Sequence, residues 1–64
     1  MKVRDAIDAL RRSGFRPLRT RGSHQTWGRG NERITLVVNH LNADILPKTL
    51  ARIDSLLHGG AERR

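Results

Sequence analysis

The apolar positions at the start of the chain recur with the period of a helix. They fall three or four residues apart, at Val3, Ala6, Ile7 and Leu10. This spacing places them on one face of a helix over residues 2–13. Gly14 follows where a glycine with positive φ commonly ends a helix, and Phe15 is placed to contact Leu10. The pattern therefore predicts an amphipathic helix whose apolar face meets a core.

The next segment has no helical period and predicts three short antiparallel strands. The expected strands cover residues 15–21, 23–27 and 33–38, with a loop of turn formers at 28–31. Pro17 indicates an edge position or a bulge, because proline has no N–H to donate to a ladder. Gly22 is a natural turn residue. In the last strand, alternation places one set of side chains on a single face: Ile34, Leu36 and Val38.

A second helix follows a connection over residues 39–46. Pro47 suits its first turn, where the missing N–H costs nothing. Helical spacing returns in the apolar residues Leu50, Ile53, Leu56 and Leu57. Gly59-Gly60 is expected to end this helix, with His58 near free carbonyls of its last turn. The predicted organisation is one domain over residues 1–58 and a flexible tail over 59–64.

These elements predict an α+β fold with the order α-β-β-β-α. Two amphipathic helices can cover only one face of a small sheet, so both are expected on the same face. The expected core consists of Val3, Ile7, Leu10, Phe15, Trp27, Leu36, Leu50, Ile53 and Leu57. Because strand side chains alternate, a core position for Trp27 makes His24 project from the uncovered face.

The charge of the chain favours a polyanionic partner. Its 64 residues carry thirteen Lys and Arg against six Asp and Glu, a formal charge of +7. Five arginines and one acid, Glu32, fall within residues 16–33. Guanidinium groups match phosphate oxygens, which favours nucleic acid or an acidic protein as partner, although such charges also protect sheet edges. Without cysteines, a signal peptide or an apolar stretch of membrane-spanning length, we expect a soluble protein of the cytoplasm.

Histidine is the candidate catalytic residue type. The spacing of His24, His40 and His58 fits no local zinc pattern, and no cofactor motif occurs, so neither a metal nor a cofactor is expected. An imidazole ordinarily titrates near pH 6.5 and moves protons at neutral pH. RNA supplies its own nucleophile, the 2′-hydroxyl, so a histidine beside a bound phosphate needs only to move a proton. Nearby arginine offsets charge in the transition state.

The order of several short motifs resembles the HicA family of mRNA-cleaving toxins. These are Gly14-Phe15, Arg19, Gly22-Ser23-His24, the strand 34–38, His40, Ile45-Leu46-Pro47-Lys48-Thr49-Leu50 and Ile53. The resemblance spans residues 3–57. Two positions depart from the family pattern, since Val37-Val38-Asn39 lacks a proline before His40 and Lys48 replaces a glycine. Neither departure touches the Gly22-Ser23-His24 turn.

The resemblance implies a fold similar to double-stranded-RNA-binding domains, metal-independent ribonuclease activity and neutralisation by a HicB-type antitoxin. It places the catalytic histidine at His24. The RNA contacts are expected from Arg19, Arg21, Gly22, Ser23, Arg29 and Arg33. The second proton-transfer group stays open among Ser23, His40 and solvent. The alternative is a non-catalytic RNA-binding module of the same fold. A helix-turn-helix DNA-binding protein is disfavoured, because strands separate the helices.

Overall fold

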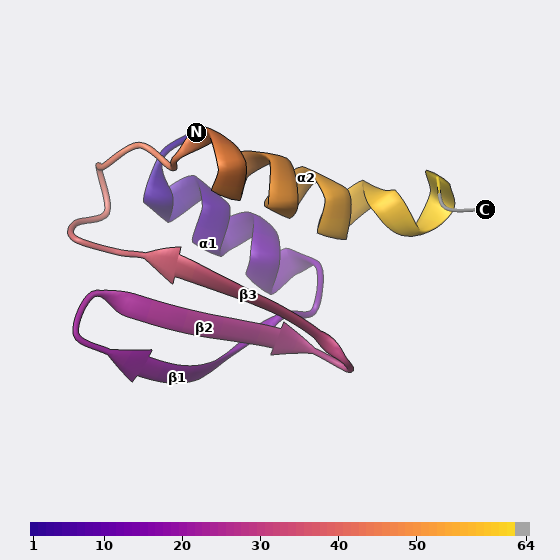
Figure 1. Ribbon diagram of the computed structural model, residues 1–64, viewed down its shortest axis with the longest axis horizontal. Helices are drawn as coiled ribbons and strands as arrows, with labels where there is room; N and C mark the ends of the chain where they lie inside the picture. The colour runs from indigo at the N-terminus through magenta and orange to yellow at the C-terminus, as the bar shows by residue number, and fades with distance from the viewer. Residues whose placement is uncertain (63–64) are drawn as a thin grey trace.

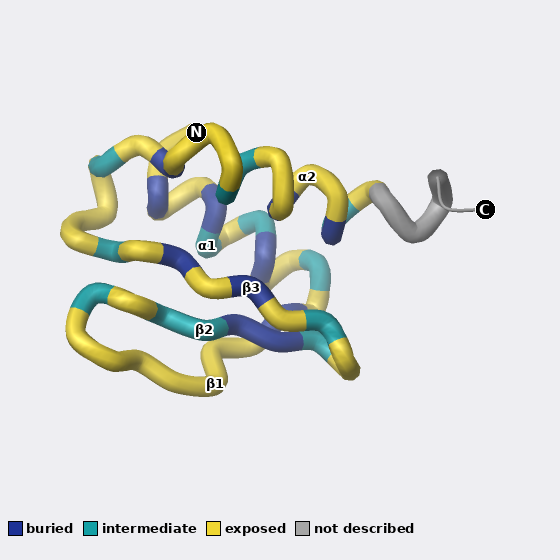
Figure 2. Tube along the Cα trace, viewed as in Figure 1, coloured by how far each residue is buried: buried dark blue, intermediate teal, exposed yellow. Residues whose placement is uncertain are grey.

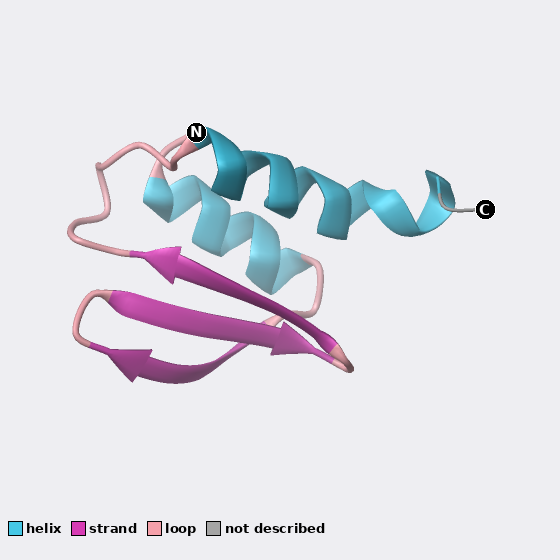
Figure 3. Ribbon diagram, viewed as in Figure 1, coloured by secondary structure: helices cyan, strands magenta, loops and turns pink. Residues whose placement is uncertain are grey.

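The computed structural model describes the backbone of residues 1–62 and the side chains of residues 1–58. Along the chain the elements are α1 (Val3–Arg12), β1 (Arg16–Arg21), β2 (His24–Arg29), β3 (Glu32–Val37) and α2 (Pro47–Glu62). The predicted α+β class and its α-β-β-β-α order are therefore confirmed (Figures 1 and 3).

The three strands form one antiparallel sheet in the order β1-β2-β3. Both helices lie on the same side of this sheet, as predicted, and no helix within residues 1–62 lies on its other side (Figure 1). β1 is an edge strand, and its register with β2 shifts between Pro17 and Arg19. The sequence-based expectation of an edge or a bulge at Pro17 is thus confirmed in both respects.

The core lies between the sheet and the two helices. Its buried residues are Val3, Ala6, Leu10, Phe15, Trp27, Ile34, Leu36, Ile45, Ile53 and Leu56. Six of these were predicted. Three other predicted members, Ile7, Leu50 and Leu57, are only partly buried and pack against the cluster. Leu56 is turned further inward than its neighbour Leu57, so the buried stripe of α2 is displaced by one residue from the expected one.

The end of α1 has the geometry that the sequence predicts. Gly14 has a φ of 92°, which favours glycine, and its N–H donates to Arg11 O at 3.1 Å. The N–H of Phe15 donates to Leu10 O at 2.9 Å. These two bonds form a Schellman motif, which satisfies carbonyls left unpaired at the helix end. The motif turns Phe15 back into the core beside Leu10.

The start of α1 is capped by the connection between β3 and α2. No side chain caps this helix at Lys2. Instead, Val3 N donates to Ala43 O at 2.8 Å and Arg4 N donates to Leu41 O at 3.1 Å. An isolated bridge pairs Lys2 with Asp44, and their side chains form an ion pair at 3.2 Å. The connection is therefore fastened to the first helix rather than loose.

Two predicted boundaries are wrong. The second hairpin turn contains only Gly30-Asn31, and Gly28 and Arg29 belong to β2 instead of a loop. Gly30 has a φ of 57° and Asn31 has no positive φ, the combination of a type II′ turn, whose twist suits a two-residue hairpin. The extra strand residues place Arg29 opposite Glu32.

The other boundary is the end of α2, which continues through Gly59-Gly60 to Glu62. Glycine lowers helix propensity by about 1 kcal/mol per residue but does not forbid the helix. His58 therefore lies within the helix, and its Nε2 is 3.9 Å from Asp54 Oδ1 one turn earlier. Its predicted contact with terminal carbonyls is wrong. The side chains of the tail predicted over 59–64 lie outside the described residues.

Candidate functional site

The helix-free face of the sheet, called the open face below, consists of three rows of directly opposed residues. The rows are Arg21 with His24 and Val37, Arg19 with Thr26 and Thr35, and Arg16 with Gly28 and Arg33. Opposed residues in an antiparallel sheet share a face. The hydroxyls of Thr26 and Thr35 lie 3.2 Å apart, which shows the middle row directly.

His24 is the first residue of β2 and is exposed on the open face. Trp27 faces the opposite side and is buried, so their predicted opposite orientations are confirmed. Arg21 lies directly across from His24 on β1. Opposed side chains start from Cβ atoms about 5 Å apart, so the imidazole and the guanidinium can reach one anionic group together. This end of the face therefore places an imidazole opposite a guanidinium.

The turn before His24 is tight and unobstructed. It contains only Gly22 and Ser23, and Gly22 has a φ of 56° while Ser23 has no positive φ. These values match a type II′ turn. No atom outside the immediate chain lies within 4 Å of where a Cβ of Gly22 would stand. The backbone of the turn is therefore accessible to an approaching ligand.

Ser23 and His40 lie at the same end of the sheet as His24. The Ser23 carbonyl accepts a bond of 2.6 Å from Val38 N, which continues the pairing of β2 with β3 beyond the strands. Two residues later, the His40 carbonyl accepts a bond of 3.1 Å from Ala43 N. The His40 side chain is exposed. Of the three alternatives for a second proton-transfer group, the two that are residues of the chain, Ser23 and His40, thus lie toward the His24 end of the sheet.

Arginines dominate the rest of the open face. β1 is exposed along its whole length (Figure 2) and contributes Arg16, Arg19 and Arg21. Gly28 makes room for two long side chains, since a Cβ there would stand 2.5 Å from Leu18 Cδ1 and 2.8 Å from Arg33 Nη1. Sequence reasoning did not single out Gly28 or Leu18, although an interior glycine in a strand indicates a close approach.

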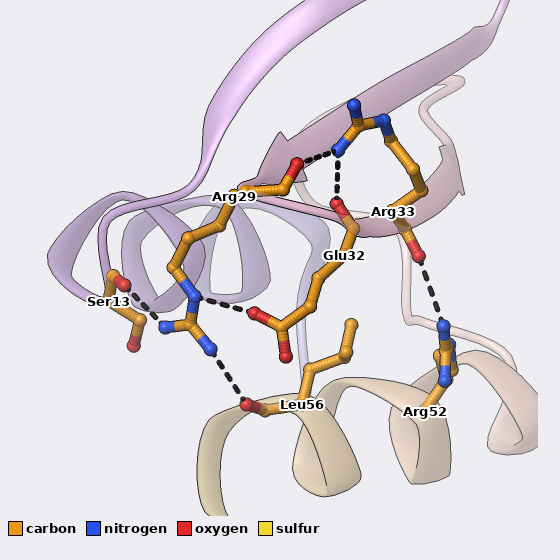
Figure 4. A network of polar contacts seen from close by, with 7 residues as sticks. Ser13, Arg29, Glu32, Arg33, Arg52 and Leu56 are labelled. Carbon is orange, nitrogen blue, oxygen red and sulfur yellow. Dashed lines mark hydrogen bonds and ion pairs between the residues drawn. The ribbon is translucent and has the colours of Figure 1, made fainter. Parts of the chain in front are cut away.

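Arg33 has a local role beside its place on the open face. Its Nη1 donates to Gly30 O and Glu32 O, both at 2.7 Å, and so holds the second hairpin turn. Its own carbonyl accepts a bond of 3.2 Å from Arg52 Nη2. Figure 4 shows the Arg33 guanidinium directed away from Arg52, so the two cations do not face the same space.

Arg29 lies on the helix side of the sheet, unlike the other arginines of residues 16–33. Its guanidinium donates to Glu32 Oε1 at 2.8 Å, Ser13 O at 2.6 Å and Leu56 O at 3.2 Å (Figure 4). It also lies over the Phe15 ring, 4.4 Å from the centroid. These contacts give Arg29 a structural role, and we leave it out of the candidate RNA-binding surface. Arg29 lies two residues after Trp27, and residues two apart in a strand point to the same face. This spacing is the sequence signal that places Arg29 on the helix side.

Within residues 1–58, no group of three His, Cys, Asp or Glu side chains gathers in a way that suits a metal ion. None of the helices within residues 1–62 is both long and apolar enough to cross a membrane.

Comparison with known proteins identifies the family. A family model described as the HicA toxin of bacterial toxin-antitoxin systems matches residues 3–58. Searches of curated proteins and of solved structures give no match. The matched segment runs from the first residue of α1 to the last described side chain of α2, and it includes all three strands. The chain therefore belongs to the HicA toxin family of bacterial toxin-antitoxin systems.

Proposed function

We propose that this chain cleaves mRNA without a metal ion, with His24 as the acid–base group. The observation that carries the proposal is the pairing of an exposed His24 with Arg21, directly opposite on a face that no helix covers. Members of the family are known as mRNA interferases, which supports RNA as the substrate. An mRNA substrate places the activity in the cytoplasm.

The proposed reaction uses the nucleophile that RNA carries. The 2′-oxygen attacks the adjacent phosphorus and loses its proton, the bond from phosphorus to the 5′-oxygen breaks, and that oxygen gains a proton. The products are a 2′,3′-cyclic phosphate and a 5′-hydroxyl. His24 takes up or delivers one of the two protons. The other passes through Ser23, His40 or solvent.

In this scheme the arginines of β1 bind the RNA backbone and stabilise the transition state. Arg21 lies where it can offset the charge that develops on the phosphoryl oxygens. Arg19 follows in the next row, beside the Thr26 and Thr35 hydroxyls, and extends the cationic track along the strand. Gly22 and Ser23 let the RNA backbone approach the turn. Arg33 supplies a further cation at the far end of the face.

A HicB-type antitoxin completes the proposal. The family is one of toxin-antitoxin systems, which implies a protein partner for this chain. The chain has a formal charge of +7, so the partner is acidic at its contact surface. Neutralisation follows if the bound antitoxin keeps RNA from the open face.

The test is cleavage of a single-stranded RNA by purified protein in EDTA, compared with the His24→Ala variant. We expect cleavage by the wild type and a loss in rate of about 10²–10⁴ in the variant, the usual contribution of a general acid or base. His58→Ala, which removes an exposed histidine from α2, is the matched control and should cleave like the wild type. Melting curves of all three proteins should coincide.

Two results would contradict the proposal. If a folded His24→Ala protein cut RNA at the wild-type rate, the histidine would not be catalytic. If the wild type bound RNA tightly but did not cleave it, the chain would be the alternative, a non-catalytic RNA-binding module.

A further inference from the structure

The outer edge of β3 carries backbone groups that no other strand pairs. β3 is the last strand of the sheet order, and Val38 N donates to Ser23 O just beyond the pair of His24 and Val37. Hydrogen-bonded and non-hydrogen-bonded pairs alternate in an antiparallel ladder. The N–H and C=O groups of Thr35 and Val37 therefore point outward, away from β2.

The two edges of the sheet differ in how they resist pairing with another chain. β1 contains Pro17, a register shift and three exposed arginines, all features that block strand addition. The outward-facing positions of β3 are Arg33, Thr35 and Val37. Thr35 and Val37 are uncharged and β-branched. The register of β3 with β2 continues from Glu32 to Val37 without a shift. The β3 edge is thus uninterrupted by a bulge and able to pair.

A trough runs along this edge, between β3 and the first turns of α2. One hollow of about 270 Å³ lies beside Thr35 and is bordered by Lys48 and Arg52. A second hollow of about 150 Å³ lies beside Val37 and is bordered by Leu46. Thr49 lines both hollows, so they adjoin, and together they form the trough. The bond from Arg52 Nη2 to Arg33 O shows an outward-facing carbonyl of this edge already accepting a donor from outside the sheet.

We propose that the outer edge of β3 binds an extended, acidic segment of a partner protein as a fourth strand. Backbone groups of Thr35 and Val37 would pair with the added strand. Lys48 and Arg52 are exposed and supply positive charge along the first hollow. Leu46, 63% exposed, offers apolar contact at the second.

Charge decides between the possible occupants. A second copy of this chain also has a formal charge of +7, so two β3 edges would meet with like charges around them. The one acid bordering the trough, Asp44, is already paired with Lys2 at 3.2 Å. An acidic strand therefore fits best. Identifying its owner as the HicB-type antitoxin rests on the function proposed above.

The first test is residue-resolved amide hydrogen exchange by NMR. The probe is a purified HicB-type antitoxin, added to the full chain with His24→Ala to remove any cleavage. Amides of Ile34 and Leu36 already bond within the sheet and should be slow before and after binding. Those of Thr35 and Val37 should exchange fast alone and at least about tenfold more slowly in the complex. This alternation is specific to strand addition.

The second test removes one outward-facing N–H. Thr35→Pro should weaken antitoxin binding about tenfold or more, because a backbone hydrogen bond and the fit of the strand are lost. Thr35→Val keeps the N–H and removes only the hydroxyl, so its affinity should stay close to the wild type. Thr20→Pro makes the same change on the outer edge of β1 and should also leave affinity unchanged.

Several outcomes would overturn the inference. One is an antitoxin that leaves the Thr35 and Val37 amides fast while protecting those of the Gly22-Ser23 turn. Another is protection of the β3 edge by RNA alone or by self-association at high protein concentration. Neither outcome bears on RNA cleavage by the wild type, so failure here is distinguishable from failure of the proposed reaction.

Discussion

The guanidinium of Arg29 lies over the ring of Phe15, with its central carbon 4.4 Å from the ring centroid. The same group donates to the carbonyl of Ser13 after α1 and to that of Leu56 in α2. Across the hairpin, Glu32 Oε1 accepts a hydrogen bond of 2.8 Å from the Nε of Arg29. One side chain thus ties the second hairpin to both helices, in a core that has few large residues.

Arg29→Ala should destabilise the fold more than any other single arginine truncation on the sheet. Loss of several hydrogen bonds to a charged group and of the ring contact should cost about 2 kcal/mol. In a domain of this size such a loss lowers the melting temperature by roughly 8–16 °C. Thermal unfolding followed by far-UV circular dichroism measures it. Arg16→Ala, on the exposed open face, is the control and should melt within a few degrees of the wild type.

Arg19→Ala and Arg21→Ala should weaken RNA binding without changing stability. Each removes a cation from the open face. The negative slope of log affinity against log salt concentration should therefore become less steep by about 0.7 for single-stranded RNA. Fluorescence anisotropy with labelled RNA in the His24→Ala background gives the slope. Arg4→Ala removes the same charge from α1 and should leave the slope almost unchanged. Equal slopes for all three variants would mean that only net charge matters.

Gly22→Ala should destabilise the first hairpin through backbone conformation alone. The position has a φ of 56° and open space around the missing Cβ, so no clash contributes. An L-residue in this region costs about 1–2 kcal/mol. A synthetic chain with D-Ala at position 22 is the matched control, since its preferred φ is positive, and should melt like the wild type. Similar melting of the L-Ala and D-Ala chains would contradict the turn assignment.

Gln25→Ala should destabilise the core by removing a partner of the buried tryptophan. The Gln25 Oε1 accepts the indole N–H of Trp27 at 3.2 Å, on a side chain that is only 1% exposed. A buried donor left without a partner costs about 1–3 kcal/mol. Denaturant unfolding followed by the fluorescence of the single tryptophan measures the loss. Gln25→Glu keeps an acceptor and should lose less; an equal loss would show that the hydrogen bond contributes nothing.

The element order and both sheet faces could be predicted because each depends on local patterns. Each pattern shows which side chains face the core or an edge. These patterns are the apolar stripes of α1 and α2, the proline of β1 and the alternation of β3. Alternation also gave the opposite orientations of His24 and Trp27. What the sequence did not reveal is how far each element runs. Pairing with β3 keeps Gly28 and Arg29 in the strand despite the preference of glycine for turns, and α2 continues through Gly59-Gly60 despite the low helix propensity of glycine.

The candidate site was only partly predictable, because charge alone does not tell which face a side chain occupies. Five arginines between residues 16 and 33 looked equivalent in the sequence. The structure places four of them on the open face and turns Arg29 to the helices. The difference follows from a two-residue turn at Gly30-Asn31, which fixes the alternation of Arg29 with Trp27. If residues 28–31 formed a loop, as the sequence predicted, Arg29 would not be assigned to either face of the sheet.

Both helices contribute to one core, with Val3 and Leu10 from α1 and Ile53 and Leu56 from α2. The hairpin that carries His24 packs against this core through Trp27. A hairpin without its packed helices is at best marginally stable. The Arg21 and His24 pair therefore acquires its geometry only when both helices are packed on the sheet. The geometry of the open face is thus coupled to the folding of every element from α1 to α2, although neither helix contributes a residue to that face.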